Sequence, residues 1–298
     1  MLFLLTDKSF HKTNKAEVTK LERKIPKVIH YCWFGGKPLP PLAKKCIASW
    51  KKYCPDYRIV QWNEDSFDLE RCDFIKEAYA EKRWAFVSDA ARLFVIYEHG
   101  GVYLDTDVEL KASLDALAGE NEFFFGIEKQ TNIRKQTEAA RVNTGLGFGA
   151  AAGCEAVGAM LEEYTGIHFN SSGVDDVTPC PTKNSHALER YGFDYKDKLY
   201  RFGGGVIYPS EYMCPKEHMT GLTHFSDKTV SIHHYGESWV TPRVKYWNKL
   251  NLKFRQFLPD AVSHYLASYI SYLVFYGLIM GHFKLFKTLF VKVRGRLI

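Results

Sequence analysis

The chain has 298 residues, of which 46% are hydrophobic, 15% aromatic and 25% charged. This composition can bury a sizeable core, so it excludes a disordered protein and predicts one or two domains. The net charge is +6, with no dense basic stripe in the body of the chain. We therefore expect no nucleic-acid partner, whereas an anionic small molecule or an acidic membrane face would suit the charge.

The cysteines indicate a reducing compartment. There are seven, an odd number, and no two are spaced as C-x-x-C. This pattern is neither a disulfide framework nor a zinc ribbon. We therefore expect a cytoplasmic protein.

Strands and helices alternate along the chain, which predicts an α/β fold. Residues 84–98 have apolar side chains at helical spacing, and Gly100 and Gly101 can end that helix. The other expected elements are strands at residues 27–34, 57–62, 102–104, 123–127, 205–208 and 229–234, a helix from the prolines near residue 40 through Trp50, and a helix at 155–164. We expect a lead-in at residues 1–24, one α/β domain at 25–258 and a helical tail at 259–298.

Two aspartates follow the strand at residues 102–104. On an extended backbone, Asp105 and Asp107 would point to the same side and could address one hard cation, Mg²⁺ or Mn²⁺. Alone, D-x-D also fits a polar turn. An EF-hand is excluded because Leu110 stands where that loop needs glycine.

A second pair of charges lies on the preceding helix. Asp89 and Arg92 are three residues apart and so share one face. They form either an ordinary surface ion pair or a carboxylate and a guanidinium that bind sugar and phosphate oxygens.

Three segments together resemble glycosyltransferase family 32. They are Ile25-Pro-Lys-Val-Ile-His-Tyr-Cys-Trp-Phe-Gly-Gly36, Ala85-Phe-Val-Ser-Asp-Ala-Ala-Arg92 with Gly100-Gly-Val-Tyr-Leu-Asp-Thr-Asp107, and Ile232-His-His-Tyr-Gly-Glu-Ser-Trp239. The chain is also similar to the catalytic domain of the clostridial glucosylating toxins. The resemblance implies a Rossmann-like GT-A fold and a retaining transfer of a hexose from a nucleotide-diphosphate sugar.

The resemblance also implies roles for individual residues. Trp33 would stack on the base, and Asp89 and Arg92 would hold the sugar and ribose. Asp107 would bind the metal directly, while Asp105 would contact ribose and metal-bound water. The further implied contacts are His233 on the metal, with His234 or Glu237 as substitutes, Ser238 and Trp239 on the diphosphate, and Asn143 near the acceptor or donor sugar.

Two other classes of protein also fit D-x-D. A haloacid-dehalogenase-type phosphatase places this motif after a strand, and Asp175 and Asp176 could mimic its later acidic motif. A metal-dependent sugar-binding module could use D-x-D as a calcium clamp. The phosphatase alternative leaves Asp89, Trp33, Ser238 and Trp239 unused, whereas a sugar-binding module would use aromatic side chains as platforms.

Two further expectations concern the acceptor and the C-terminal tail. We expect a glycan or lipid-linked acceptor, such as a growing capsular polysaccharide. The 23 residues between Asp260 and Lys284 carry no Asp, Glu, Lys or Arg, and four tyrosines recur there at helical spacing. With the basic residues that follow, this favours either peripheral contact with the cytoplasmic membrane face or packing on protein.

Overall fold

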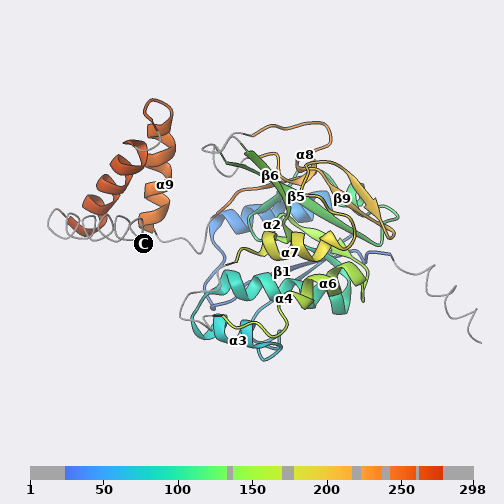
Figure 1. Ribbon diagram of the computed structural model, residues 1–298. Helices are drawn as coiled ribbons and strands as arrows, with labels where there is room; N and C mark the ends of the chain where they lie inside the picture. Colours follow the sequence, from blue (N-terminus) through green and yellow to red (C-terminus); the bar gives the residue numbers. More distant parts are fainter. Residues whose placement is uncertain are drawn as a thin grey trace, which may run out of the picture. The chain divides into compact units, whose positions relative to one another are not determined.

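The computed structural model describes residues 24–132, 137–169, 178–216, 223–236, 242–259 and 262–277. It contains two compact units that divide between Tyr235 and Gly236, ahead of the boundary after residue 258 that we expect from the sequence. Each unit is described here by itself (Figure 1).

One half of the sheet in the first unit is parallel. β1 (Val28–Cys32) pairs in parallel with β2 (Arg58–Trp62) and with β3 (Gly101–Tyr103). Two crossover segments make this possible, because parallel neighbours need a long connection. The first contains α2 (Pro41–Tyr53), which begins with proline. Proline suits this position because the first N–H groups of a helix have no acceptor within the helix.

The second crossover contains α3 (Asp73–Ala80) and α4 (Trp84–His99), and α4 leads directly into β3. Gly100 and Gly101 both have positive φ, at 62° and 105°. A Cβ on Gly101 would lie 2.7 Å from the carbonyl oxygen of Val28, so glycine is required where the chain turns from α4 into the sheet.

The other half of the sheet is mixed. β7 (Phe148–Ala150) runs antiparallel to both β3 and β5 (Phe123–Asn132), and β5 pairs in parallel with β9 (Gly205–Tyr208). The full order is β2-β1-β3-β7-β5-β9-β8, with β8 (Tyr200–Phe202) at the edge. A hairpin strand, β6 (Thr137–Val142), extends β5 beyond this path.

Side chains on alternate strand positions enter two separate cores. Phe123 and Phe125 pack with residues of α3, α4, α6 (Glu155–Glu162) and α7 (Cys180–Glu189), whereas Phe124 packs with residues of α2. The period of two along a strand explains this division. Helices on both faces of a mixed sheet confirm the expected α/β fold (Figure 1).

The elements expected from the sequence are present with shifted ends, and the strand at residues 205–208 matches residue for residue. Helix α3, helix α7 and the β5–β6 hairpin were not expected. Short elements complete the unit: α5 (Asp115–Ala118), η1 (Thr144–Leu146), α8 (Ser210–Met213), and the two-stranded sheet of β4 (Val108–Leu110) with β10 (Ser231–His233).

The second unit is helical. It contains α9 (Pro242–Arg255) and a further helix at residues 262–277, which confirms the helical tail over that range. Ser263, Ala267 and Ser271 recur every four residues on that helix and are fully buried. Trp247 of α9 donates a hydrogen bond to Ser268 at 2.9 Å, so the two helices pack together. Within the described ranges, no helix combines the length and apolarity that crossing a bilayer requires.

Candidate active site

Arg92 is buried beneath the end of the sheet, with only 3% of its surface exposed. Its Nη2 lies 2.7 Å from Oδ1 of Asp89 and 3.3 Å from Oδ1 of Asp105, and its Nε donates to the Ser88 carbonyl at 3.0 Å. The guanidinium also lies 5.0 Å from the centre of the Tyr103 ring. The pair with Asp89 is therefore not an ordinary surface ion pair.

The Asp89 carboxyl is a weak acid in this setting. Burial raises its pKa, the Arg92 charge opposes that rise, and the resulting pKa is about 6. Near neutral pH the group is thus mostly ionised, but it can exchange a proton under mildly acidic conditions.

Asp105 and Asp107 lie in a turn between β3 and β4. The amide of Val108 donates to the Asp105 carbonyl at 2.9 Å, so the backbone here is bent rather than extended. The same-side argument from an extended strand is therefore wrong in its geometry. The turn nevertheless brings the two carboxylates together, and the hydroxyl of Tyr103 donates to Oδ1 of Asp105 at 3.0 Å.

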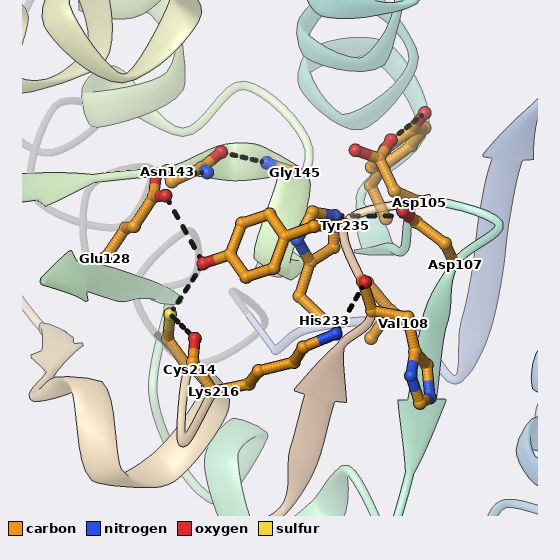
Figure 2. A network of polar contacts seen from close by, with 12 residues as sticks. Asp105, Asp107, Val108, Glu128, Asn143, Gly145, Cys214, Lys216, His233 and Tyr235 are labelled. Atoms are coloured by element: carbon orange, nitrogen blue, oxygen red, sulfur yellow. Dashed lines mark hydrogen bonds and ion pairs between the residues drawn. The ribbon is translucent and has the colours of Figure 1, made fainter. Parts of the chain in front are cut away.

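His233 completes the group from a distant part of the chain. β10 pairs antiparallel with β4 and places His233 opposite Val108. Nε2 of His233 lies 3.1 Å from Oδ1 of Asp107. One potential ligand atom from each of Asp105, Asp107 and His233 lies within 4.8 Å of the others (Figure 2).

These three side chains fit a divalent cation. Two carboxylate oxygens and an imidazole nitrogen are a donor set that Mn²⁺ accepts. Burial opposes a charge on His233, but Asp107 and Asp105 outweigh it and raise the pKa of the imidazole. A bound cation would compensate the negative charge of the two carboxylates.

The structure distinguishes between the two neighbouring histidines. Nε2 of His234 lies 2.8 Å from Oε2 of Glu109, and Glu109 also binds the ammonium groups of Lys45 and Lys111. His234 is thus held in an ion-pair network beside the aspartates. His233 is the histidine that the fold brings to Asp107.

A tight loop covers the other side of Asp105. Oδ1 of Asn143 accepts a hydrogen bond from the amide of Gly145 at 2.7 Å, which caps η1. A Cβ on Gly145 would lie 2.7 Å from Oδ2 of Asp105 and 3.2 Å from Nη1 of Arg92. The loop therefore needs glycine in order to approach the two charged groups.

Sequence reasoning did not find Glu128. This carboxylate of β5 is 5% exposed; its Oε2 accepts from Nδ2 of Asn143 at 2.8 Å, and its Oε1 accepts from the Tyr235 hydroxyl at 3.3 Å. The Tyr235 hydroxyl also lies 3.1 Å from Sγ of Cys214 (Figure 2). The only signal in the sequence is an acidic residue directly after the apolar run at residues 123–127.

The remaining predicted residues are placed less fully. Trp33 directly follows β1, and its indole donates to the Lys37 carbonyl at 2.5 Å. Since β1 and β3 are parallel neighbours, Trp33 lies at the same sheet edge as Asp105. Glu237, Ser238 and Trp239 lie outside the described residues, as do Asp175 and Asp176.

This geometry can be compared with known proteins. Residues 40–124 match the family described as "Glycosyltransferase sugar-binding region containing DXD motif", and this segment contains Asp89, Arg92 and both aspartates of the turn. Over these residues the chain is similar to glycosyltransferases that contain a DXD motif. The resemblance of the sequence motifs to that family is thereby confirmed.

Two curated relatives are inositol phosphoceramide mannosyltransferases of Schizosaccharomyces pombe. Mannosyltransferase 1 is 30% identical over 34% of this chain and 33% of its own length. Mannosyltransferase 3 is 31% identical over 31% of this chain and 27% of its own length. The matched glycosyltransferase segment thus spans about a third of each relative.

Solved glycosyltransferases show a looser similarity in three dimensions. One is the PaToxG glycosyltransferase, with 17% identity and a TM-score of 0.41 over 60% of this chain and 78% of that protein. Another is a glycosyltransferase involved in glycosylation of the major capsid of PBCV-1, with 14% identity and a TM-score of 0.38 over 77% of this chain and all of that protein.

Proposed function

We propose that the protein transfers a hexose from a nucleotide-diphosphate sugar onto a hydroxyl of a glycan or lipid-linked acceptor. The observation that carries this proposal is the convergence of Asp105, Asp107 and His233 beside the buried Asp89–Arg92 pair, within a DXD sugar-binding region. The shape of the pocket selects the sugar and the base of the donor. The two curated relatives are mannosyltransferases.

Each residue has a role that its position supports. Asp107 and His233, with Asp105, would hold Mn²⁺ or Mg²⁺; the bound cation would neutralise charge on the departing diphosphate. Arg92 is fixed by Asp89 and Asp105, and its Nη1 is buried without a hydrogen-bond partner among the described atoms. That free donor group can bind a donor-sugar or ribose oxygen. Asp89 can accept hydrogen bonds from sugar hydroxyls.

Asn143, Trp33, Ser238 and Trp239 complete the proposed donor site. Asn143 reaches it through the loop that touches Asp105. Trp33 lies at the same sheet edge and would stack on the base. Ser238 and Trp239 follow His233 by a few residues and would contact the diphosphate.

A panel of nucleotide sugars, with Mn²⁺, Mg²⁺ or excess chelator, tests the function. We expect transfer or slow donor hydrolysis with one donor, dependent on the cation. Asp107→Ala should reduce the rate on the order of 10²–10³-fold, and Asp227→Ala, at an exposed aspartate, serves as the control. Full activity in chelator would exclude the metal-dependent mechanism.

The same panel separates the two alternatives. A haloacid-dehalogenase-type phosphatase would release inorganic phosphate, and a sugar-binding module would release neither sugar nor phosphate. The family match favours neither of them. We further propose that the anomeric configuration is retained, and NMR of the fresh product would reveal an inverted linkage directly.

We also propose that the tail contacts the cytoplasmic membrane face and brings the site to a lipid-linked acceptor. Tyr265 and Tyr276 on the helix at residues 262–277 are 49% and 38% exposed, and Phe257 is 78% exposed. Aromatic side chains with one wet end suit the membrane interface.

Co-sedimentation with anionic phospholipid vesicles tests this proposal. Binding should weaken with salt and disappear when residues 260–298 are removed, whereas neutral vesicles should bind less. If the intact protein stays in the supernatant with anionic vesicles at low salt, the tail packs on protein instead.

A further inference from the structure

Glu128 is a buried acid whose hydrogen-bond partners among the described residues are neutral side chains. Its residue exposure is 5%, and none of the ion pairs among the described residues includes it. An ionised carboxylate at such a position is costly unless hydrogen bonds satisfy both oxygens. Here each oxygen receives one neutral donor, from Asn143 and from Tyr235.

The hydrogen bond from Asn143 connects Glu128 to the loop beside Asp105. With its Nδ2 on Glu128, Asn143 presents its Oδ1 to the Gly145 amide, so both ends of the side chain are fixed. Gly145 in turn is in close contact with Oδ2 of Asp105. A shift of Asn143 would therefore displace the loop that packs on Asp105.

The hydrogen bond from Tyr235 connects Glu128 to the segment that carries His233. The Tyr235 ring packs edge-on against the His233 ring, with centroids 4.3 Å apart. Tyr235 has a positive φ of 53°, a conformation that an aromatic residue adopts only where surrounding contacts hold it. The hydrogen bond to Glu128 is such a contact, since it anchors the far end of the ring.

We propose, resting on the glycosyltransferase function above, that Glu128 is a positioning residue of the metal site. One oxygen holds the loop beside Asp105 and the other holds the strand end that carries His233, so the two sides of the site keep a fixed separation. Two donors converge on Glu128, and a carboxylate offers two acceptors whereas an amide offers an acceptor and a donor. Glutamine keeps only one such acceptor, and its N–H either faces Nδ2 of Asn143 or requires the Tyr235 hydroxyl to accept, so one of the two hydrogen bonds is lost or reversed.

The test measures Mn²⁺ affinity by isothermal titration calorimetry on the full chain, at a temperature well below each variant's unfolding. Glu128→Gln should weaken Mn²⁺ binding about tenfold, as loss of supporting residues behind metal ligands does. Tyr235→Phe, which keeps the ring and loses only the hydroxyl, should weaken it in the same direction. Glu120→Gln is the matched control, because its side chain is 85% exposed.

The double variant distinguishes a shared link from two independent effects. If Glu128 acts partly through Tyr235, adding Tyr235→Phe to Glu128→Gln should cost less than the two single effects together. In the transfer assay, the Mn²⁺ concentration for half-maximal rate should rise more than the rate at saturating Mn²⁺ falls. Wild-type Mn²⁺ affinity in folded Glu128→Gln or in Tyr235→Phe would overturn the proposal.

Failure of the proposed function gives a different result. If the wild-type protein binds no Mn²⁺, the metal site itself is wrong and the role of Glu128 falls with it. If the wild type binds Mn²⁺ and transfers sugar while Glu128→Gln is indistinguishable from it, only the positioning role is refuted.

Discussion

Arg92 and Asp105 come from different elements, and their side chains meet at 3.3 Å below the DXD turn. The same guanidinium binds Asp89 at 2.7 Å, so one buried cation joins α4 to the turn after β3. A planar group with several fixed donors can hold two carboxylates and still direct another N–H elsewhere. This single side chain therefore sets the positions of two acidic groups of the proposed donor site.

Replacing Arg92 by lysine should be damaging although the charge is kept. Lysine cannot reach Asp89, Asp105 and the Ser88 carbonyl at once, so we expect kcat/KM to fall about 10²-fold. Steady-state kinetics with the identified donor would measure this. Arg71→Lys, in a partly exposed pair with Glu98, is the control and should change little. Near-normal kinetics for Arg92→Lys would show that the planar guanidinium, with its several N–H donors, is not required.

Gly145→Ala should disturb the site without adding charge. The new Cβ would lie 2.7 Å from Oδ2 of Asp105 and 2.9 Å from Oδ1 of Asn143, so these groups must move apart. We expect a loss of stability of about 1–3 kcal/mol, with weaker Mn²⁺ binding. Gly158→Ala in α6 is the comparison, because its Cβ meets only the Tyr97 ring, at 3.2 Å. An unchanged melting temperature and Mn²⁺ affinity in Gly145→Ala would contradict the close approach of this loop to Asp105.

Donor binding should depend on pH through Asp89. Burial raises the pKa of this carboxyl to about 6 despite Arg92, so protonation increases as the pH falls through that value. The neutral form accepts hydrogen bonds less well, and we expect the KM of the donor to rise below pH 6. Asp89→Asn should have a high KM that is nearly independent of pH over this interval. A wild-type profile that stays flat between pH 5 and 7 would argue against a role for Asp89.

Glu109 should stabilise the fold at neutral pH. Burial opposes its charge, but Lys111, Lys45 and His234 outweigh burial and lower the pKa to about 2. Because the pKa in the folded state lies below the unfolded value of 4.5, the stabilisation is present above pH 4.5 and is lost as the pH falls towards 2. Glu109→Gln should lose on the order of 2 kcal/mol at pH 7, and less at pH 3. Denaturant titrations at both values measure the difference, with Glu120→Gln as the control.

Local patterns predicted the parts of the site that depend on neighbouring residues. The spacing of Asp89 and Arg92 placed them on one helical face, and the paired glycines after α4 marked the start of β3. The D-x-D spacing identified Asp105 and Asp107, although a turn and not an extended strand brings them together. Such features follow from backbone geometry within a few residues.

Tertiary contacts decided the rest. Glu128 lies in a strand whose sequence offers no reason to choose it, and its role depends on Asn143 and Tyr235, which join it only in the folded chain. Likewise, two adjacent histidines look equivalent in sequence. The register of β10 against β4 turns His233 to Asp107 and leaves His234 to Glu109.

The pairing of β10 with β4 also bears on how the protein is made. His234 follows Glu109 by 125 residues, so the D-x-D turn, which directly precedes Glu109, leaves the ribosome long before His233. At about 5–20 residues per second, the interval is roughly 6–25 s. During that time the acidic turn lacks its partner, and a nascent chain cannot assemble the cation site. The proposed cation site is thus completed late, after all strands of the large sheet have been synthesised.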